Sequence, residues 1–272
     1  MKTSWILEED TFNEGESLLK AVQDLGLPYE VVKYGPFASG SYDHLFPNQC
    51  VVAYGSLNLV SQLQRLKLWV PGPYCTFENF DCTNYYPKFG PRLFNGDYLA
   101  IYYGQIRQKL PEIKARFGSE VFIRPNSGMK LFPGQVIYTD HLTSLNSPDL
   151  EARSIVLISK PRIIKAEYRF FVCGNEVVAG SQYRKDGQLS LTSVIDGNAQ
   201  SFAQSLVSLY QPDKVYSLDI CEAGGKFWLL ELNSFSCAGL YACDASKLVQ
   251  AVSIQAQLDY DKPKQNGLEF QL

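Results

Sequence analysis

Two carboxylates and a side-chain amide stand close together in a β-hairpin that the sequence predicts near its C-terminal end. Two apolar, β-rich runs flank residues 223–226, whose adjacent glycines suit a tight turn. A three-residue loop centred on Gly225 places Asp219 opposite Glu231, with Asn233 on the face of Glu231. Facing carboxylates repel unless a proton or a cation lies between them. These oxygens predict a Mg²⁺ site; the alternative is solvated residues on an open sheet face.

The same alternation predicts the composition of both faces of the second hairpin strand. One face carries Phe227, Leu229, Glu231 and Asn233, and the other carries Trp228, Leu230 and Leu232. Two polar groups thus interrupt an otherwise apolar face, which suggests that they have a role beyond packing.

A basic loop earlier in the chain is a second candidate for chemistry. Residues 121–123 and 135–137 are predicted strands, and the loop between them contains two glycines, two prolines and the cations Arg124 and Lys130. Exposed backbone amides that are backed by fixed cations can hold phosphate oxygens. The loop does not contain the G-x-x-x-x-G-K-[ST] pattern, and the alternative interpretation is a solvated turn.

More cations follow in the next predicted strands. The apolar residues 155–158 predict a buried strand, and residues 167–173 and 177–183 predict a hairpin that carries Arg169 and ends at Arg184. Charges of this kind often belong to the solvated face of a sheet. Cations at several strand ends, followed by a hairpin with paired carboxylates, favour instead a site that neutralises a triphosphate and its Mg²⁺.

Composition limits the classes of function. The 272 residues are 46% hydrophobic and 19% charged, with a net charge of −3, so the chain can bury a core but offers no basic field for nucleic acid or an anionic membrane. The N-terminus lacks the apolar core of a secretory signal, and no apolar run is long enough to span a membrane. We therefore expect a cytoplasmic protein. The seven cysteines show no zinc spacing and are expected to be reduced core residues.

The first 95 residues predict a small α/β domain. Strands and helices alternate, which indicates a parallel sheet with crossover helices. The predicted strands are residues 4–7, 28–34, 50–54 and 69–70, and the predicted helices are 14–25 and 56–67. No G-x-G-x-x-G follows the first strand, so this domain carries no dinucleotide signal.

The domain boundary is expected in residues 71–96, an irregular connection rich in Pro, Gly, Asn and aromatic residues. Residues 97–117 then predict a helix that Pro111 kinks or divides. A last helix is expected from about residue 244 to 256. The predicted division is a domain of residues 1–95, a second domain of residues 96–258 and a polar, fraying tail of residues 259–272.

Taken together, four motifs resemble those of the ATP-grasp superfamily of carboxylate–amine ligases. They are F-I-R-P-N-S-G-M-K, E-Y-R-F-F-V, S-Q-Y-R and L-D-I followed by L-L-E-L-N-S-F-S-C-A-G-L-Y. More narrowly, they are similar to a small branch, found in bacteria and phages, whose active site is rich in arginine and lysine. The likeness covers residues 119–244 and implies an α/β (α+β) ATP-grasp fold with an N-terminal Rossmann-like domain before it.

The resemblance implies ATP and Mg²⁺ as cofactors and assigns roles to the residues singled out above. The Mg²⁺ ligands are Asp219, Glu231 and Asn233. Arg124 stands where most ATP-grasp enzymes carry a phosphate-binding lysine, and Lys130 lies in the flexible loop over the phosphates. The guanidinium of Arg124 can still grip phosphate at two points.

The resemblance also implies the remaining contacts. Residues 156–160 match the hinge that cradles adenine through its backbone, which makes cofactor-binding candidates of Leu157, Ile158, Ser159 and Lys160. Arg169 and Arg184, the catalytic candidates, face the γ-phosphate and an acyl-phosphate intermediate. Residues 234–239 either shape the acceptor pocket or form a small-residue turn before the last helix.

The implied activity is that of an ATP- and Mg²⁺-dependent ligase that joins a carboxylate to an amine and releases ADP. The carboxylate or the amine can belong to a peptide or a protein. Two alternatives use the same ATP site: a phosphotransferase, which has no amine step, and a nucleotide-binding module without turnover.

Overall fold

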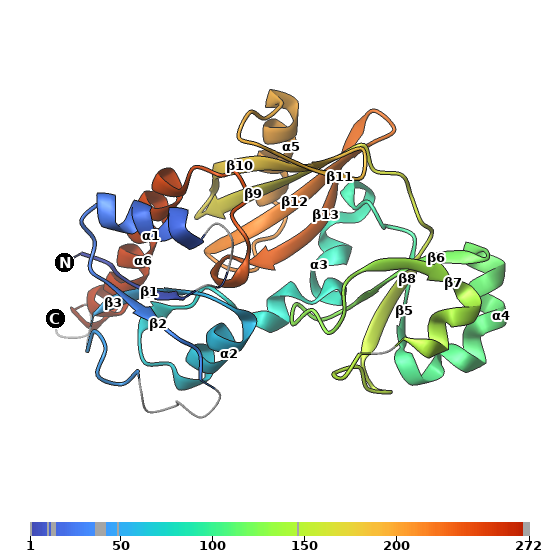
Figure 1. Cartoon of the computed structure of the whole chain (residues 1–272), viewed down its shortest axis with the longest axis horizontal. Coiled ribbons are helices and arrows are strands. Elements are labelled where there is room, and N and C mark those ends of the chain that lie inside the picture. Colours follow the sequence, from blue (N-terminus) through green and yellow to red (C-terminus); the bar gives the residue numbers. More distant parts are fainter. Residues whose placement is uncertain are drawn as a thin grey trace.

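The chain folds into three β-sheets with helices around them (Figure 1). This computed structural model describes residues 2–9, 11, 15–35, 42–47, 49–145 and 147–268. The predicted mixture of helices and sheets is confirmed. In the part of the chain that is described, no helix has both the length and the apolar character that a membrane crossing needs.

The N-terminal part is a parallel four-stranded sheet, as the alternation of elements predicts. Its order is β2-β1-β3-β4, and every pair in it is parallel. The elements are β1 (Ser4–Glu8), α1 (Gly15–Asp24), β2 (Tyr29–Val32), β3 (Cys50–Tyr54), α2 (Leu57–Leu66) and β4 (Val70–Gly72). All five residues of β3 are buried because this strand lies inside the sheet and is covered on both faces.

The connection of residues 71–96 is more regular than expected, because it contains the helix α3 (Cys82–Phe89) after a short 3₁₀ turn, η1 (Phe77–Phe80). Proline at position 87 lies inside α3 and hides the helix from a sequence-based interpretation. Tyr85, Tyr86 and Phe89 are each at most 2% exposed, so aromatic burial holds this helix in place.

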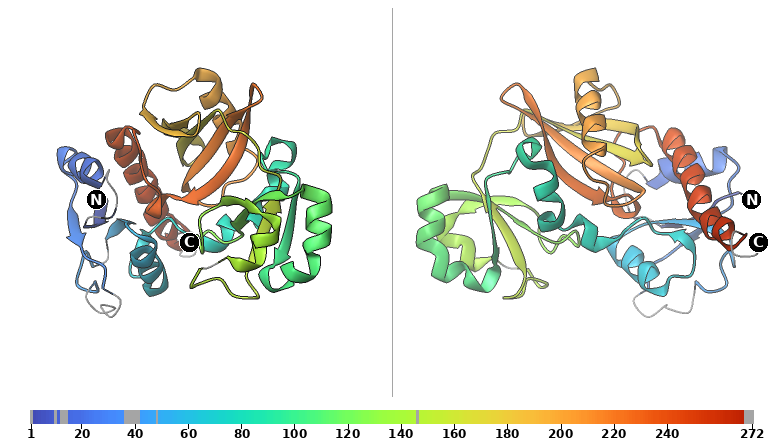
Figure 2. Two further views of the ribbon diagram at one scale, coloured as in Figure 1. Left: turned by 45° about the vertical axis from the view of Figure 1, so that its right-hand side comes forward. Right: turned by 180° about the vertical axis from the view of Figure 1, so that it is seen from behind.

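The second sheet forms a lobe of its own (Figure 2). It is antiparallel with the order β5-β8-β6-β7. The elements are β5 (Tyr98–Tyr102), α4 (Ile106–Phe117), β6 (Glu120–Pro125), β7 (Gln135–Tyr138) and β8 (Ile155–Ser159). The single helix expected at residues 97–117 is therefore wrong in its first part, which is strand β5, whereas Pro111 lies inside an uninterrupted α4.

The third sheet is a five-stranded antiparallel sheet with the order β11-β10-β9-β12-β13. Its elements are β9 (Ala166–Cys173), β10 (Glu176–Lys185), β11 (Gln188–Thr192), β12 (Val215–Ala223) and β13 (Lys226–Ser234). One face packs against α5 (Gly197–Val207) through a core of Phe170, Leu218, Leu206 and Ala203. Aromatic side chains of α3 belong to the same core. The other face looks toward the two other sheets (Figure 1).

The hairpin of β12 and β13 pairs Asp219 with Glu231, as predicted, but through a different construction. Gly224 and Gly225, both with positive φ, form a two-residue turn between Ala223 and Lys226. A β-bulge between Asp219 and Ile220 then adds one residue, Leu230, to β13 and restores the pairing of Asp219 with Glu231.

The bulge also changes the faces of β13. Phe227, Leu229 and Leu232 pack in one core cluster, whereas Trp228 and Leu230 pack in another. Strict alternation along β13 was therefore the wrong expectation, because the extra residue moves Phe227 and Leu229 to the face opposite the two polar groups.

The C-terminal helix α6 (Ala245–Leu268) joins the N-terminal sheet to the third sheet, and is longer than expected. The Trp5 indole donates to Ser253 Oγ at 3.0 Å, and the Tyr74 hydroxyl donates to Asp259 Oδ2 at 2.9 Å. The start of the predicted tail is therefore tied to the fold rather than frayed. The domain boundary between residues 95 and 96 stays a prediction. Helix α6 contacts the sheets on both sides of this boundary. Five of the seven cysteines are buried.

Candidate active site

A cleft of about 400 Å³ lies between the second and third sheets. Strand β6 and the loop after it form one wall, and strands β10 and β13 form the other. The charged residues that line it are Arg124, Lys130, Glu167, Arg184 and Glu231. The cleft thus collects three of the four predicted cations, all except Arg169, around one carboxylate of the metal hairpin.

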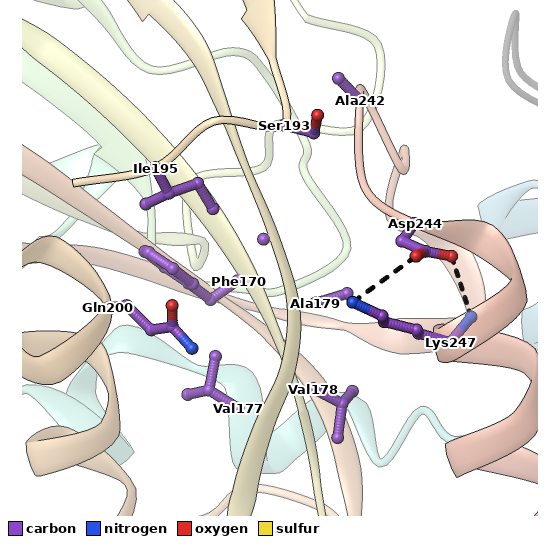
Figure 3. A pocket seen from close by; sticks show the side chains of 11 residues that line it. Phe170, Val177, Val178, Ala179, Ser193, Ile195, Gln200, Ala242, Asp244 and Lys247 are labelled. Atoms are coloured by element: carbon purple, nitrogen blue, oxygen red, sulfur yellow. Dashed lines mark hydrogen bonds and ion pairs between the residues drawn. The ribbon is translucent and has the colours of Figure 1, made fainter. Parts of the chain in front are cut away.

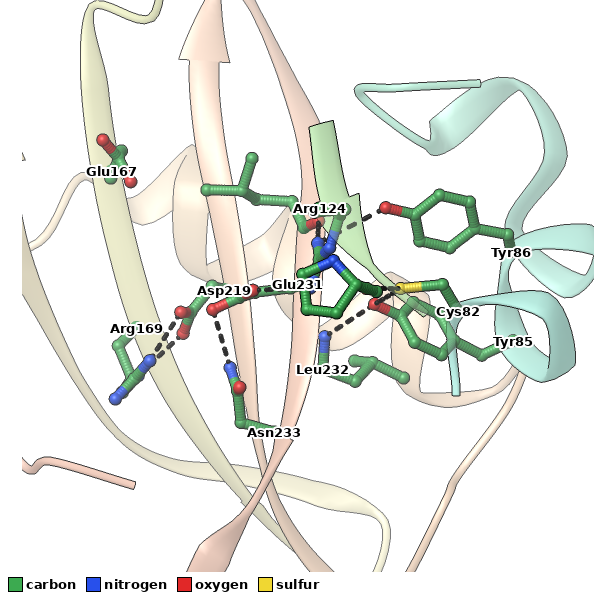
Figure 4. Close-up of polar contacts among 12 residues, drawn as sticks. Cys82, Tyr85, Tyr86, Arg124, Glu167, Arg169, Asp219, Glu231, Leu232 and Asn233 are labelled. Atoms are coloured by element: carbon green, nitrogen blue, oxygen red, sulfur yellow. Dashed lines mark hydrogen bonds and ion pairs between the residues drawn. The ribbon is translucent and has the colours of Figure 1, made fainter. Parts of the chain in front are cut away.

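Arg124 connects the two sheets across the cleft (Figure 4). Its NH2 group donates to Glu231 Oε2 at 2.9 Å, and its NH1 group donates to the Tyr86 hydroxyl at 3.4 Å and to the Leu230 carbonyl at 3.5 Å. Within the described residues its buried Nε has no hydrogen-bond partner. One donor of this guanidinium is therefore left for another acceptor.

The charge of Glu231 is set by its surroundings. Burial acts to raise the pKa of this carboxyl, but Arg124, Lys130 and a 3.0 Å hydrogen bond from Asn233 Nδ2 outweigh burial and bring the pKa to about 2. Glu231 is therefore a carboxylate at every ordinary pH. Glu231 and Asn233 both line the cleft, so both can offer an oxygen to a cation there.

Asp219 lies deeper, at the floor of the site. Arg169 forms a two-point ion pair with it, Nε to Oδ1 at 2.8 Å and NH2 to Oδ2 at 2.7 Å, and the two side chains are 5% and 1% exposed. Burial raises the pKa of Asp219 to about 6, although Arg169 beside it acts to lower the pKa. Arg169 also donates to the Gly239 carbonyl at 3.1 Å.

The three predicted metal ligands thus lie on one side of the hairpin, but their availability differs. Asp219 pairs with Glu231 in register, while both Asp219 oxygens accept hydrogen bonds from Arg169. No group of three or more His, Cys, Asp or Glu side chains suited to a metal occurs in the described part of the chain. Two carboxylates and one amide are too few for a complete Mg²⁺ shell, so the other ligands have to come from water and phosphate.

Lys130 lies in the loop between β6 and β7 and has the left-handed φ of 51°. The loop is anchored at both ends. Asn126 accepts from the Thr83 amide at 2.8 Å through Oδ1, and Phe132 is buried in the core of the second sheet. The Leu131 carbonyl also accepts a hydrogen bond from Ser147 Oγ, which leaves residues 127–130 between these anchors, with Lys130 facing the cleft.

Arg184 reaches the same cleft from the end of β10 and is half exposed, with Nε 3.6 Å from Glu167 Oε1. Glu167 also accepts a 2.7 Å hydrogen bond from the Tyr183 hydroxyl. Tyr183 stacks on Tyr241 at a centroid distance of 4.6 Å. Sequence reasoning assigned no role to Glu167 or Tyr183; the E-Y-R and Q-Y-R motifs that contain them were the available signal.

The four predicted adenine contacts lie elsewhere. Leu157 and Ile158 are at most 2% exposed, and the backbone of their strand β8 pairs with β5 on one side and with β6 on the other. Ser159 and Lys160 line a different pocket, beside Arg162 and Trp228. An adenine contact through this segment therefore stays a prediction, and only the backbone where β8 leaves the sheet can supply it.

The apolar part of the cleft was not predicted. It is lined by Phe122, Ile164 and Leu230, and a side chain at Gly134 would collide with Phe122, because its Cβ would lie 2.8 Å from Cζ. An apolar end beside a charged end is the shape that a nucleotide needs, with a flat base and a polyanionic tail.

Two sheets with a charged cleft between them, preceded by a parallel α/β sheet, define an ATP-grasp protein. Residues 105–251 match the family model described as "ATP-grasp domain, R2K clade family 2", and the chain belongs to this family. The predicted fold and the prediction of an ATP-dependent ligase that works with Mg²⁺ are thereby confirmed at the level of the family.

Solved structures share the fold at low sequence identity. D-alanine–D-alanine ligase from Bacillus anthracis is 13% identical with a TM-score of 0.63, over 97% of this chain and 99% of that one. D-cycloserine synthetase DcsG is 12% identical with a TM-score of 0.63, over 93% and 99%. The ATP-grasp ligase PsnB, solved with its precursor peptide PsnA2 and AMPPNP, is 10% identical with a TM-score of 0.59, over 93% and 97%. No curated protein sequence matches significantly.

Proposed function

We propose that this protein is an ADP-forming ligase that activates a carboxylate with ATP and transfers the acyl group to an amine. The observation that carries the proposal is the position of Arg124, which spans the cleft from β6 to Glu231 and keeps one buried donor without a partner. An anion with several acceptor oxygens would satisfy that donor, and a Mg²⁺ ion that arrives with it would take over the charge of Glu231.

The charges in and under the cleft fit a magnesium–triphosphate. Four cations, Arg124, Lys130, Arg169 and Arg184, stand against the three carboxylates of Glu167, Asp219 and Glu231. The β- and γ-phosphates would lie between Arg124 and Lys130. Glu231 and Asn233 would hold Mg²⁺, joined by Asp219 once Arg169 releases it. The base would occupy the apolar end near Phe122 and Ile164.

The chemistry follows from these charges. A substrate carboxylate oxygen attacks the γ-phosphorus, the bond to the β–γ bridging oxygen breaks, and ADP leaves. The amine then attacks the acyl carbon, the bond to phosphate breaks, and the amine loses a proton. Arg169 and Arg184 would stabilise the negative charge of the acyl phosphate, which needs no nucleophilic side chain of the protein. Mg²⁺ would lower the repulsion between the phosphates and the incoming carboxylate.

We assign the substrates by class. The carboxylate or the amine belongs to a peptide, because Arg184, which lines the cleft, is half exposed and so reachable by a long substrate. PsnB, an ATP-grasp ligase solved in complex with a precursor peptide, supports this assignment by analogy of fold. The same analogy with D-alanine–D-alanine ligase would instead suggest a free amino acid.

Trapping of the activated carboxylate tests the proposal. Wild-type protein is incubated with ATP, Mg²⁺, hydroxylamine and one carboxylate at a time, from amino acids to short peptides. We expect at least one carboxylate to give a hydroxamate together with ADP. The matched control is Glu231→Gln, which keeps the shape of the side chain and should give none. ADP with a stable phosphorylated product and no hydroxamate would identify a phosphotransferase, and nucleotide binding without products would identify a silent module.

A further inference from the structure

The outer edge of β10 is open over half its length. Strand β10 pairs with β9 from Glu176 to Lys185, whereas β11 pairs only with Gln182, Arg184 and Lys185. No described strand therefore covers the edge of residues 176–181. At its start the Val177 amide donates to Gln204 Oε1 at 2.9 Å, which shows that backbone donors point outward here. Proteins usually protect such edges because they can pair with another extended chain.

A pocket of about 600 Å³ lies along this open edge and reaches around both faces of the strand (Figure 3). On the α5 side it is lined by Phe170, Val177, Ile195 and Gln200. On the α6 side it is lined by Val178, Ala242, Asp244 and Lys247. An added strand would turn alternate side chains to these two sides, apolar ones toward Phe170 and Ile195 and polar ones toward the Asp244–Lys247 pair.

Glycine at position 180 shapes the middle of this edge. A Cβ there would lie 2.6 Å from both Ile195 Cδ1 and Phe170 Cδ1, so a side chain would displace the apolar wall of the pocket. Glycine at this position lets Ile195 and Phe170 pack directly against the backbone of β10 and form that wall. A close backbone approach is the usual reason for a glycine inside a strand.

The pocket adjoins the proposed active site. The Ala242 amide donates to Ser181 Oγ at 3.2 Å, and the preceding Tyr241 stacks on Tyr183, which lines the cleft. Gly180 and Tyr183 are three residues apart on β10, which corresponds to roughly 10 Å. A chain bound along the open edge therefore reaches the cleft with a few further residues.

We propose that the edge of β10 at residues 176–181 binds an extended segment of the peptide substrate as an added strand, with apolar and polar residues in alternation. This proposal rests on the proposed function only in calling the bound peptide a substrate, because binding of a peptide at this edge does not require turnover. Backbone hydrogen bonds would supply affinity, and the two sides of the pocket would select side chains.

Binding is measured without ATP, which separates this proposal from the activity. The probes are fluorescein-labelled hexapeptides in which valine alternates with lysine, threonine or glutamate, followed by fluorescence anisotropy. N-methylation of every second residue removes the hydrogen-bond donors of one strand edge only. We expect methylation in one register to weaken binding by about tenfold or more, and methylation in the other register to have little effect.

A pair of exposed serines provides matched variants. Ser193 lines the pocket and Ser205 lies on α5 outside the pocket lining. Ser193→Trp should fill the pocket and weaken peptide binding about tenfold, whereas Ser205→Trp should bind like wild type, and both should bind AMPPNP unchanged. Equal effects of the two methylation registers, equal binding by the two variants or no binding of any probe would overturn the proposal. So would a dimer in sedimentation that Ser193→Trp abolishes, because the occupant would then be a second copy of the chain.

Discussion

Replacement of Arg169 by methionine should destabilise the protein strongly, although the methionine side chain fills most of the space that the arginine side chain occupies. The guanidinium holds both oxygens of Asp219 at 2.8 and 2.7 Å, and Asp219 is 1% exposed, so no water can take its place without a rearrangement. Removal of one partner of a buried pair leaves an uncompensated charge and costs about 3–5 kcal/mol of unfolding free energy. The double variant Arg169→Met with Asp219→Leu removes both charges and should recover most of this loss.

Urea unfolding followed by circular dichroism at neutral pH measures these differences. The matched control is Arg153→Met, which breaks an ion pair of the same length, 2.7 Å, whose side chains are 86% and 60% exposed. This control should cost less than about 1 kcal/mol. A loss of similar size for Arg169→Met and Arg153→Met would refute the reasoning. In the Arg169→Met variant Asp219 is also free of its partner, so Mg²⁺ alone should stabilise this variant more than wild type.

Three further predictions follow from single features. Glu231→Gln should abolish turnover because the neutral amide weakens Mg²⁺, and full activity in a turnover assay would contradict the role. The same change should lower the free energy of unfolding by up to about 3 kcal/mol, because the pKa of Glu231 is depressed from 4.5 to about 2 and its charge therefore stabilises the fold. Trypsin should cut after Lys130 in the free protein, with AMPPNP and Mg²⁺ protecting this site but not Arg153; equal cleavage would exclude a lid.

The third concerns Asp213, whose pKa burial raises from 3.8 to about 6 against the lowering effect of the Lys214 and Thr76 amides. Because the pKa is raised in the folded state, the folded protein keeps the proton of Asp213 up to a higher pH than the unfolded chain does. The contribution of this group to the free energy of unfolding is therefore fully present below pH ~4 and is lost as the pH rises through ~6. In Asp213→Asn the fall in the free energy of unfolding between about pH 4 and 6 should be smaller by up to about 3 kcal/mol. An unchanged dependence of the unfolding free energy on pH would contradict this prediction.

The hairpin of β12 and β13 illustrates how much of the fold a sequence can predict. Alternation and the two glycines predict the hairpin and the pairing of Asp219 with Glu231, because both depend on local geometry. The two-residue turn and the bulge between Asp219 and Ile220 compensate each other in the register. They could not be predicted separately, since a bulge is fixed by packing on both faces of the sheet.

The elements around the cleft were harder to predict for a different reason. Helix α3 contains a proline and is held by buried tyrosines, so its tertiary contacts outweigh its weak helical pattern. The ion pair of Arg169 with Asp219 joins residues 50 positions apart in the chain. The sequence pattern predicted that both residues belong to the site. Only the three-dimensional structure shows that the two side chains form an ion pair with each other.

The most direct test of the central claim is the fate of oxygen during turnover. A carboxylate found by hydroxamate trapping is labelled with ¹⁸O and turned over with ATP, Mg²⁺ and its amine, and the phosphorus products are analysed by ³¹P NMR. Attack on the γ-phosphorus should give ADP and inorganic phosphate that carries ¹⁸O, because the acyl phosphate releases the labelled oxygen with phosphate. Labelled AMP with pyrophosphate, or phosphate without the label, would contradict the claim.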